Sequence, residues 1–226
     1  MAAGCQEQKA KISRVSVIIP TLDAAHLLPP LLAQLEGVGE VILADGGSGD
    51  GLAALGPRVV AAPRGRGTQL AAGAAAAQCE WLLFLHADTR LEPGWQAAVR
   101  AAMDQPGRAH YFRFALDDPS PQARRLETAV AWRCRWLALP YGDQGLLISR
   151  ELHAEIGGYR PLPLMEDVEL ARRLGRARLA CLPARAITSA DRWRRDGWWR
   201  RSGRNLLTLS LYFCGVSPER LARLYR

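Results

Sequence analysis

The segment 82-LLFLHADTRLEPGW-95 contains the most informative transition in this sequence, because an apolar run gives way to a histidine, a carboxylate and a hydroxyl. The apolar residues 82–85 predict a buried strand. A lone carboxylate is costly to bury unless it is paired or bound to a cation. Two interpretations are therefore open. Asp88 or Thr89, followed by Glu92, caps the next helix, or Asp88 lies at the carboxyl end of a strand and binds something positive.

Three apolar runs that precede this segment predict short strands of the same kind, at residues 15–19, 41–44 and 59–62. Helical patterns separate them, including an alanine-rich helix that ends near Gln78. Fully apolar strands alternating with helices are typical of a parallel sheet that is covered on both faces. The carboxyl ends of such strands meet at one edge, where open α/β sheets bind ligands. Polar residues follow all four runs: Thr21 and Asp23, Asp45, Arg64 and Arg66, and His86 and Asp88.

The second half of the chain is less regular. We expect strands over residues 111–116 and 146–149, and helices over 121–137, 150–156 and 164–174. The predicted domain organisation is a flexible tail over residues 1–12, one α/β domain over 13–190 with halves at 13–110 and 111–190, and an Arg- and Trp-rich helical extension over 191–226.

The charge balance is basic: 30 Lys and Arg stand against 22 Asp and Glu, a formal net charge of +8. Only Lys9 and Lys11 are lysines, so the excess is almost entirely arginine. A basic surface suits anionic substrates, phospholipid or RNA. Because the sequence contains no recognised nucleic-acid-binding module, we expect no nucleic-acid partner. The hydrophobic fraction of 49% excludes a disordered chain.

The five cysteines form no C-x-x-C pair, so neither a zinc site nor a disulfide framework is predicted, and a reducing cytoplasm fits best. The amino terminus lacks the apolar core of a signal peptide. The longest carboxyl-terminal apolar run, 206-LLTLSLYFCGV-216, is shorter than the roughly 20 residues that span a bilayer. We expect the extension either to pack on the domain as a helical hairpin or to lie peripherally on the inner face of a membrane.

Several motifs have both a structural and a functional interpretation. The glycines of 42-ILADGGSGDG-51 form no strict G-x-G-x-x-G match and suit a flexible turn, whereas Asp45 at a strand end suits a nucleobase edge or ribose hydroxyls. Arg66 is either a solvated charge or a bidentate ligand for a diphosphate. Glu166 and Asp167 either favour the dipole of the helix that they begin, or supply a general base to a hydroxyl.

Taken in order, these segments resemble family 2 glycosyltransferases, which have the GT-A fold. The resemblance rests on VSVIIPTLDAA (15–25), EVILADGGSGDG (40–51), RGRGTQLAAGAAAA (64–77), LLFLHADT (82–89), YGDQGLLISRELHAEIGGY (141–159) and LMEDVELARRL (164–174). Within the family, FLHADT, GDQG and PLMEDVELARRLGR are similar to a small bacterial subgroup associated with selenium- and arsenosugar-linked gene clusters.

The resemblance implies a mostly parallel central sheet with helices on both faces, and a set of residues that binds a nucleotide sugar. That set is Pro20, Thr21, Asp23, Asp45, Gly46, Arg66, Gln69, His86, Ala87 and Asp88. Asp88 matches the last acid of the family's D-x-D motif and would ligate Mg²⁺ or Mn²⁺ that bridges the diphosphate. His86 stands where that motif has its first Asp, a departure that bears on metal affinity and on the ribose contact. Asp167 matches the catalytic base, with Glu166 beside it.

On the acceptor side, the resemblance implies Asp143, Gln144, Arg192 and Trp193. The last two lie in 189-SADRW-193, which is similar to the Q-x-x-R-W motif of processive members but has Ser189 in place of Gln. This departure favours a single transfer over chain extension.

The expected activity is therefore a metal-dependent, inverting transfer of a sugar from a nucleoside-diphosphate sugar, most commonly a UDP-sugar in this family, to a hydroxyl acceptor that could be lipid-linked. Two alternatives remain. A nucleotidyltransferase of related architecture would need a triphosphate-binding glycine loop after the first strand, where this chain has 21-TLD-23. A non-catalytic basic protein that binds membrane or nucleic acid would not explain why four strands end in polar residues.

Overall fold

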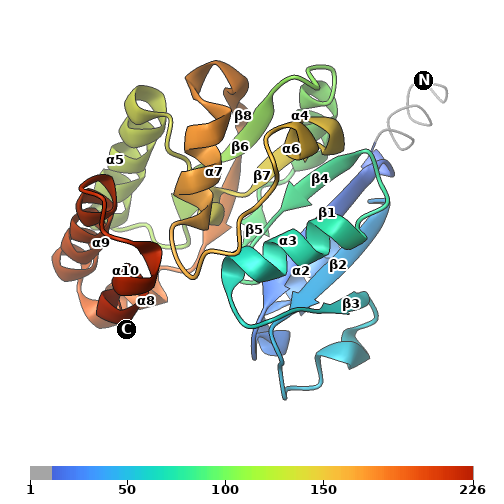
Figure 1. Ribbon diagram of the computed structural model, residues 1–226, viewed down its shortest axis with the longest axis horizontal. Helices are drawn as coiled ribbons and strands as arrows, with labels where there is room; N and C mark the ends of the chain where they lie inside the picture. The colour runs from blue at the N-terminus through green and yellow to red at the C-terminus, as the bar shows by residue number, and fades with distance from the viewer. Residues whose placement is uncertain (1–11, 226) are drawn as a thin grey trace.

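One eight-stranded sheet, in the order β3-β2-β1-β4-β7-β6-β8-β5, organises the molecule, with helices on both of its faces (Figure 1). The computed structural model describes residues 12–225. The predicted flexible tail over residues 1–12 therefore lies outside the described residues except for Ile12.

The amino-terminal half of the sheet is parallel, as the apolar runs predict. It contains β1 (Val15–Thr21), β2 (Glu40–Asp45), β3 (Arg58–Ala61) and β4 (Trp81–Phe84). Thr21 is in register with Asp45, so the carboxyl ends of β1 and β2 finish side by side. The residues that follow these two strands consequently begin at the same edge of the sheet.

The other half of the sheet contains the antiparallel pairings, although most pairings of the sheet are parallel, as expected. It contains β5 (Arg90–Leu91), β6 (Ala109–Leu116), β7 (Leu146–Ser149) and β8 (Leu179–Thr188). Three of the seven pairings are antiparallel, namely β4 with β7, β6 with β7, and β5 with β8. The sheet is therefore mixed. The expectations for β7 and for most of β6 are confirmed, whereas β5 and β8 have no counterpart among the predicted strands.

Several helices begin or end where the sequence predicts. The described α-helices are α2 (Pro29–Gln34), α3 (Arg66–Ala76), α4 (Trp95–Ala102), α5 (Pro121–Leu137), α6 (Arg150–Glu155), α7 (Glu166–Leu174), α8 (Asp191–Asp196), α9 (Trp198–Phe213) and α10 (Pro218–Tyr225). Helix α5 has the predicted bounds, and the Ser120 side chain caps it by accepting a hydrogen bond from the Ala123 N–H. Helix α7 begins at Glu166 rather than at residue 164.

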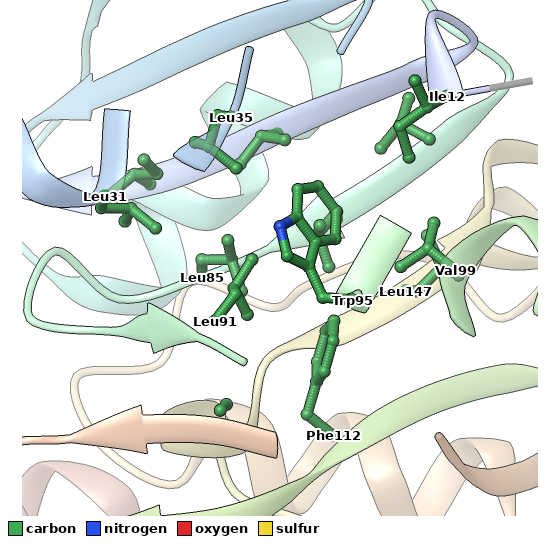
Figure 2. Packing of buried hydrophobic residues seen from close by; sticks show 14 of the residues in the cluster. Ile12, Leu31, Leu35, Leu85, Leu91, Trp95, Val99, Phe112 and Leu147 are labelled. Carbon is green, nitrogen blue, oxygen red and sulfur yellow. The ribbon is translucent and has the colours of Figure 1, made fainter. Parts of the chain in front are cut away.

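The helix-cap interpretation of Asp88 is wrong. The next helix, α4, begins at Trp95 and is preceded by Gly94 in a left-handed conformation, with no side-chain cap. Trp95 itself is buried in the core, where it lies among side chains of the sheet and of α2 such as Phe112 and Leu31 (Figure 2). The burial of Trp95, and not a cap at Asp88, therefore sets the position of α4.

Two hydrophobic clusters cover the two faces of the sheet. One contains residues of α2 and α4, such as Leu31 and Trp95, and the other contains residues of α3 and α7, such as Leu70 and Leu170. Helices α8, α9 and α10 gather at one end of the molecule near α5 (Figure 1). No helix in the described part of the chain combines the length and the apolarity needed to cross a bilayer.

Candidate active site

A cavity of about 540 Å³ opens at the carboxyl ends of β1 and β4. Its walls come from the loop after β4, the first turns of α3 and α7, the residues before β7, and helices α8 and α9. Twelve of the predicted site residues line it: Pro20, Thr21, Arg66, Gln69, His86, Ala87, Asp88, Asp143, Glu166, Asp167, Arg192 and Trp193. Segments that are far apart in the sequence therefore meet in one hollow.

The first turn of α7 brings two carboxylates to this cavity. Glu166 is only 1% exposed, and its Oε1 lies 3.1 Å from Nε of Arg66. Nη1 of the same guanidinium lies 3.7 Å from Oδ2 of Asp167. The preceding residue, Met165, has a φ of +66°, in the left-handed region that non-glycine residues rarely adopt. Backbone strain of this kind is concentrated at functional sites.

Asp167 is held in one orientation and has one oxygen to spare. The Gly142 N–H donates a hydrogen bond to Oδ2 at 2.9 Å, whereas the buried Oδ1 accepts none from the described residues. Burial raises the pKa of Asp167 above its ordinary value, and the charge of Glu166 raises it further. The Arg66 charge and the Gly142 N–H oppose this shift. A carboxylate with a raised pKa is a stronger base toward a hydroxyl proton.

Gly142 is the residue that allows this close approach. A Cβ placed there would lie 2.5 Å from Oδ2 of Asp167 and 2.7 Å from Nε2 of His86. Both distances are shorter than real Cβ contacts, so any larger residue would displace the side chains of Asp167 and His86. Gly142, in the segment before β7, thus lies against both His86, which follows β4, and Asp167 at the start of α7.

His86 and Asp88 follow β4 and differ in character. Burial, with the charges of Arg66 and Arg192, lowers the pKa of His86 to about 3, so the imidazole is neutral at pH 7. The Asp88 carboxylate lines the cavity, and among the described residues no hydrogen bond or ion pair holds it. Asp88 is thus a carboxylate that is available to a cation.

These acids fit a divalent metal only if a ligand supplies further oxygens. Residues 12–225 contain no group of three or more His, Cys, Asp or Glu side chains that could hold a metal without other ligands. Asp143 lines the same cavity as Asp88. Burial first and then the charge of Asp88 raise the pKa of Asp143, and its buried Oδ1 accepts no hydrogen bond from the described residues. Mg²⁺ is commonly bound by one or two carboxylates together with substrate phosphates. The donor set matches that mode.

Asp23 and Asp45 do not line the cavity. The Asp45 carboxylate accepts hydrogen bonds from the N–H and the hydroxyl of Ser48, and Oδ1 of Asp23 accepts one from the Gly49 N–H at 3.0 Å. Both carboxylates therefore fix the loop that follows β2. Thr21, which is in register with Asp45, does reach the cavity, so the loop adjoins it.

Gly46 and Gln144 also lie outside the lining. A Cβ at Gly46 would lie 3.1 Å from Nε2 of Gln69, an amide that ties β1 to β2 by donating to the carbonyls of Thr21 and Ala44. The buried Gln144 donates to the Phe112 carbonyl and accepts from the Tyr141 N–H. Each of three predicted binding residues thus has a role in holding the fold together: Gly46, Gln69 and Gln144.

Sequence reasoning missed one wall of the cavity, which α9 contributes. Arg201, Asn205 and Thr208 line it, and the Arg201 guanidinium lies 4.9 Å from the ring centroid of Trp193. Arg201 is 9% exposed and donates to Oδ2 of Asp196. The signal was present: three polar residues at positions i, i+4 and i+7 share one face of the helix.

Solved structures of nucleotide-sugar transferases share this fold. The mannosyltransferase PcManGT from Pyrobaculum calidifontis, in complex with GDP-Man and Mn²⁺, aligns with a TM-score of 0.63 and 20% identity over 94% of this chain and 68% of that chain. Glucosyl-3-phosphoglycerate synthase from Mycobacterium tuberculosis, with Mn²⁺, UDP and glucosyl-3-phosphoglycerate, aligns at 0.52 and 21% over 81% of this chain and 74% of that chain. The fold and its cavity thus define a protein of the GT-A class.

The sequence comparison identifies the family. The model of glycosyl transferase family 2 matches residues 16–163, and the chain belongs to that family. No curated protein matches the sequence. The predicted fold class, and the prediction that the protein is an enzyme of the glycosyltransferase type, are confirmed.

Proposed function

We propose that the protein transfers one sugar from a nucleoside-diphosphate sugar to a hydroxyl acceptor, with inversion at the anomeric carbon. The observation that carries this proposal is that one cavity contains both the unpartnered carboxylate of Asp88 and the buried, hydrogen-bonded carboxylate of Asp167. The GDP-Man and UDP complexes of the structural relatives support a nucleoside-diphosphate donor. Membership of the selenium- and arsenosugar-associated subgroup stays a prediction that rests on the FLHADT and GDQG segments.

The donor is proposed to bind across the carboxyl edge of the parallel strands. Thr21 would face the nucleoside, with Asp23 and Asp45 beside it in the adjoining loop. Arg192, which is exposed at the cavity wall, would contact the diphosphate. Asp88 would hold Mg²⁺ or Mn²⁺ against the diphosphate oxygens. When bound, the metal would offset the negative charge of the departing nucleoside diphosphate.

Asp167 is proposed to be the catalytic base. As the acceptor oxygen forms its bond to the anomeric carbon, the bond from that carbon to the diphosphate oxygen breaks, and its electron pair leaves with the nucleoside diphosphate. Asp167 takes the proton of the acceptor hydroxyl. Its raised pKa favours this transfer, and the Gly142 N–H keeps its second oxygen in place. Direct displacement inverts the anomeric configuration, and the transition state resembles that of glycoside hydrolysis.

The acceptor is proposed to enter between the segment at Asp143 and the wall formed by α8 and α9, where Trp193 and Arg201 lie. A flat indole face packs well against a sugar ring or an isoprenoid chain, so a lipid-linked acceptor is compatible with this wall.

The test is a screen of UDP-, GDP-, CDP- and dTDP-sugars for release of the nucleoside diphosphate, with and without Mn²⁺. The proposal predicts metal-dependent release from one donor class and an initial sugar product of inverted configuration by proton NMR. Retention of configuration would contradict it. Release of pyrophosphate from a nucleoside triphosphate, with no turnover of any nucleotide sugar, would favour the nucleotidyltransferase instead.

A further inference from the structure

Exposed hydrophobic side chains are concentrated at one end of the molecule. Nine large hydrophobic residues of the described chain are exposed, and eight of them lie on three helices. Three are on α5 (Trp132, Trp136 and Leu137), four are on α9, and Leu224 is on α10. We call these eight residues the C-terminal hydrophobic surface. Single exposed hydrophobic residues are common on proteins, but a concentration of this kind marks an interaction site.

Helix α9 exposes several large apolar side chains, although its Leu209 is buried. Trp199 is 79% exposed and Leu206 64%, and Leu207 and Phe213 are also exposed. A helix on the surface of a globular protein normally turns its apolar stripe toward the core. Here the residues turned inward include the polar Arg201 and Thr208, which line the cavity. The outer face of α9 therefore has the composition of a helix face that packs against another surface.

The carboxyl-terminal ends of α5 and α9 are linked through the end of α7 and the residues just after it. Arg176 donates hydrogen bonds to the carbonyls of Arg135 and Trp136 at the end of α5. Arg172 places its guanidinium 5.3 Å from the ring centroid of Phe213 on α9. Figure 1 shows these helices at the same end of the molecule. The ends of α5 and α9 that carry Trp136 and Phe213 thus lie near the same part of α7.

The positive charge of the protein is located in the same elements. Residues 121–137 and 191–225 together contain 12 arginines and four acidic residues, a formal charge of +8, which equals that of the whole chain. The remainder of the sequence therefore has no net formal charge. An exposed face of Trp, Leu and Phe flanked by arginines such as Arg200 and Arg204 is the composition of a helix that lies at the interface of an anionic bilayer.

We infer that the C-terminal hydrophobic surface docks on an anionic phospholipid bilayer, with α9 lying in the plane of the interface. The surface does not insert across the membrane, because no described helix is long and apolar enough to span it. The inner face of the same helix forms a wall of the cavity. Docking through the outer face therefore leaves only α9 between this side of the cavity and the lipid. This inference concerns attachment and does not depend on the proposed sugar transfer.

Vesicle flotation of the full chain tests the inference. Phosphatidylglycerol-rich vesicles are expected to carry the wild-type protein upward, and pure phosphatidylcholine vesicles far less, with bound protein decreasing as salt is raised. The double variant L206E/L207E should reduce the partition coefficient at least tenfold. Val59→Glu is the matched control, because Val59 is the ninth exposed hydrophobic residue but lies on β3. It should bind vesicles like the wild type.

Two further readouts make each outcome decisive. Thermal melting followed by circular dichroism should be the same for wild type and L206E/L207E, because both leucines are exposed. Equal flotation of wild type and L206E/L207E, or no flotation of the wild type with anionic vesicles, would overturn the inference. So would light scattering that shows a wild-type dimer, converted to a monomer by L206E/L207E, with no lipid binding. In that case the surface is covered by a second copy of the chain.

Discussion

The loops after β1 and β2 and the adjoining cavity all contain aspartates, yet these aspartates differ in the hydrogen bonds that they accept. At the end of β2, Asp45 accepts three hydrogen-bond contacts from Ser48, and after β1, Asp23 accepts one from Gly49. In the cavity, Asp88 has no hydrogen bond or ion pair with the described residues, and Asp143 and Asp167 each have a buried oxygen that accepts no hydrogen bond from them. The fold supplies hydrogen-bond donors to the carboxylates of Asp23 and Asp45, but leaves oxygens of the cavity carboxylates without donors among the described residues.

This difference separates the carboxylates that hold the loops beside the cavity from those that we propose bind metal or take a proton. Buried polar atoms in folded proteins are almost always hydrogen-bonded, so an oxygen left without a partner calls for an explanation such as a ligand or an ion. Desolvation also raises the pKa values of Asp143 and Asp167. Position at a strand end is therefore a weaker guide to chemistry than the hydrogen bonds that each carboxylate lacks.

The largest effect is expected for Asp167→Asn. The amide can still accept the Gly142 hydrogen bond, but it cannot take a proton, so kcat should fall by about 10²- to 10⁴-fold. Donor affinity, measured by thermal shift, should change little. A variant with near-normal kcat would remove Asp167 from the role of base.

Gly142→Ala should cause the next largest loss. The added methyl group would collide with both Asp167 and His86, and a misplacement of about 1 Å can cost roughly 10²-fold in rate. Gly49→Ala in the loop after β2 is the matched control, because a Cβ there meets nothing within 4 Å. Steady-state kinetics should show loss for the first variant only, with similar melting temperatures for both proteins. Equal activity of the two variants would show that the packing around Asp167 is not critical.

Asp45→Ala should have a smaller effect of a different kind. Losing the hydrogen bonds to Ser48 should lower the free energy of unfolding by about 1–2 kcal/mol, and should raise the donor KM while leaving kcat nearly unchanged. Denaturant unfolding and kinetics measure the two quantities separately. A fall in kcat comparable to that of Asp167→Asn would erase the distinction between the two sets of carboxylates.

The smallest effect is expected for Glu166→Gln, which should shift the pH dependence of kcat/KM. The rate needs deprotonated Asp167, so it falls as the pH drops through the pKa of Asp167, which lies above its ordinary value. Removing the Glu166 charge lowers that pKa, so the acidic limb of kcat/KM should move to lower pH. Glu151→Gln, at an exposed acid on α6, should leave the profile unchanged. A shift to higher pH would contradict the assigned coupling.

The sequence predicts the parallel half of the sheet because its strands are fully apolar, and it predicts α5 because Ser120 and Pro121 mark where that helix begins. It misses β8, 179-LACLPARAIT-188, because one arginine, three alanines and a proline hide the strand pattern. One of the two interpretations of Asp88 starts the next helix too early, because the left-handed Gly94 that precedes α4 is not a usual cap.

For the site, residue type and order predict which segments converge, since twelve predicted residues line the cavity. They do not predict which polar groups are already hydrogen-bonded. Gln144 looks like a ligand in the sequence, yet its amide is used by Phe112 and Tyr141, a pairing that depends on contacts across the fold.

The most direct test of the central claim is the thermal stability of wild type and Asp88→Ala with a nucleoside diphosphate, in the presence and absence of Mn²⁺. If Asp88 holds a metal and diphosphate together, the wild-type melting temperature should rise with UDP or GDP only when Mn²⁺ is present, and Asp88→Ala should show no such rise. An undiminished, metal-dependent rise in Asp88→Ala would contradict the account.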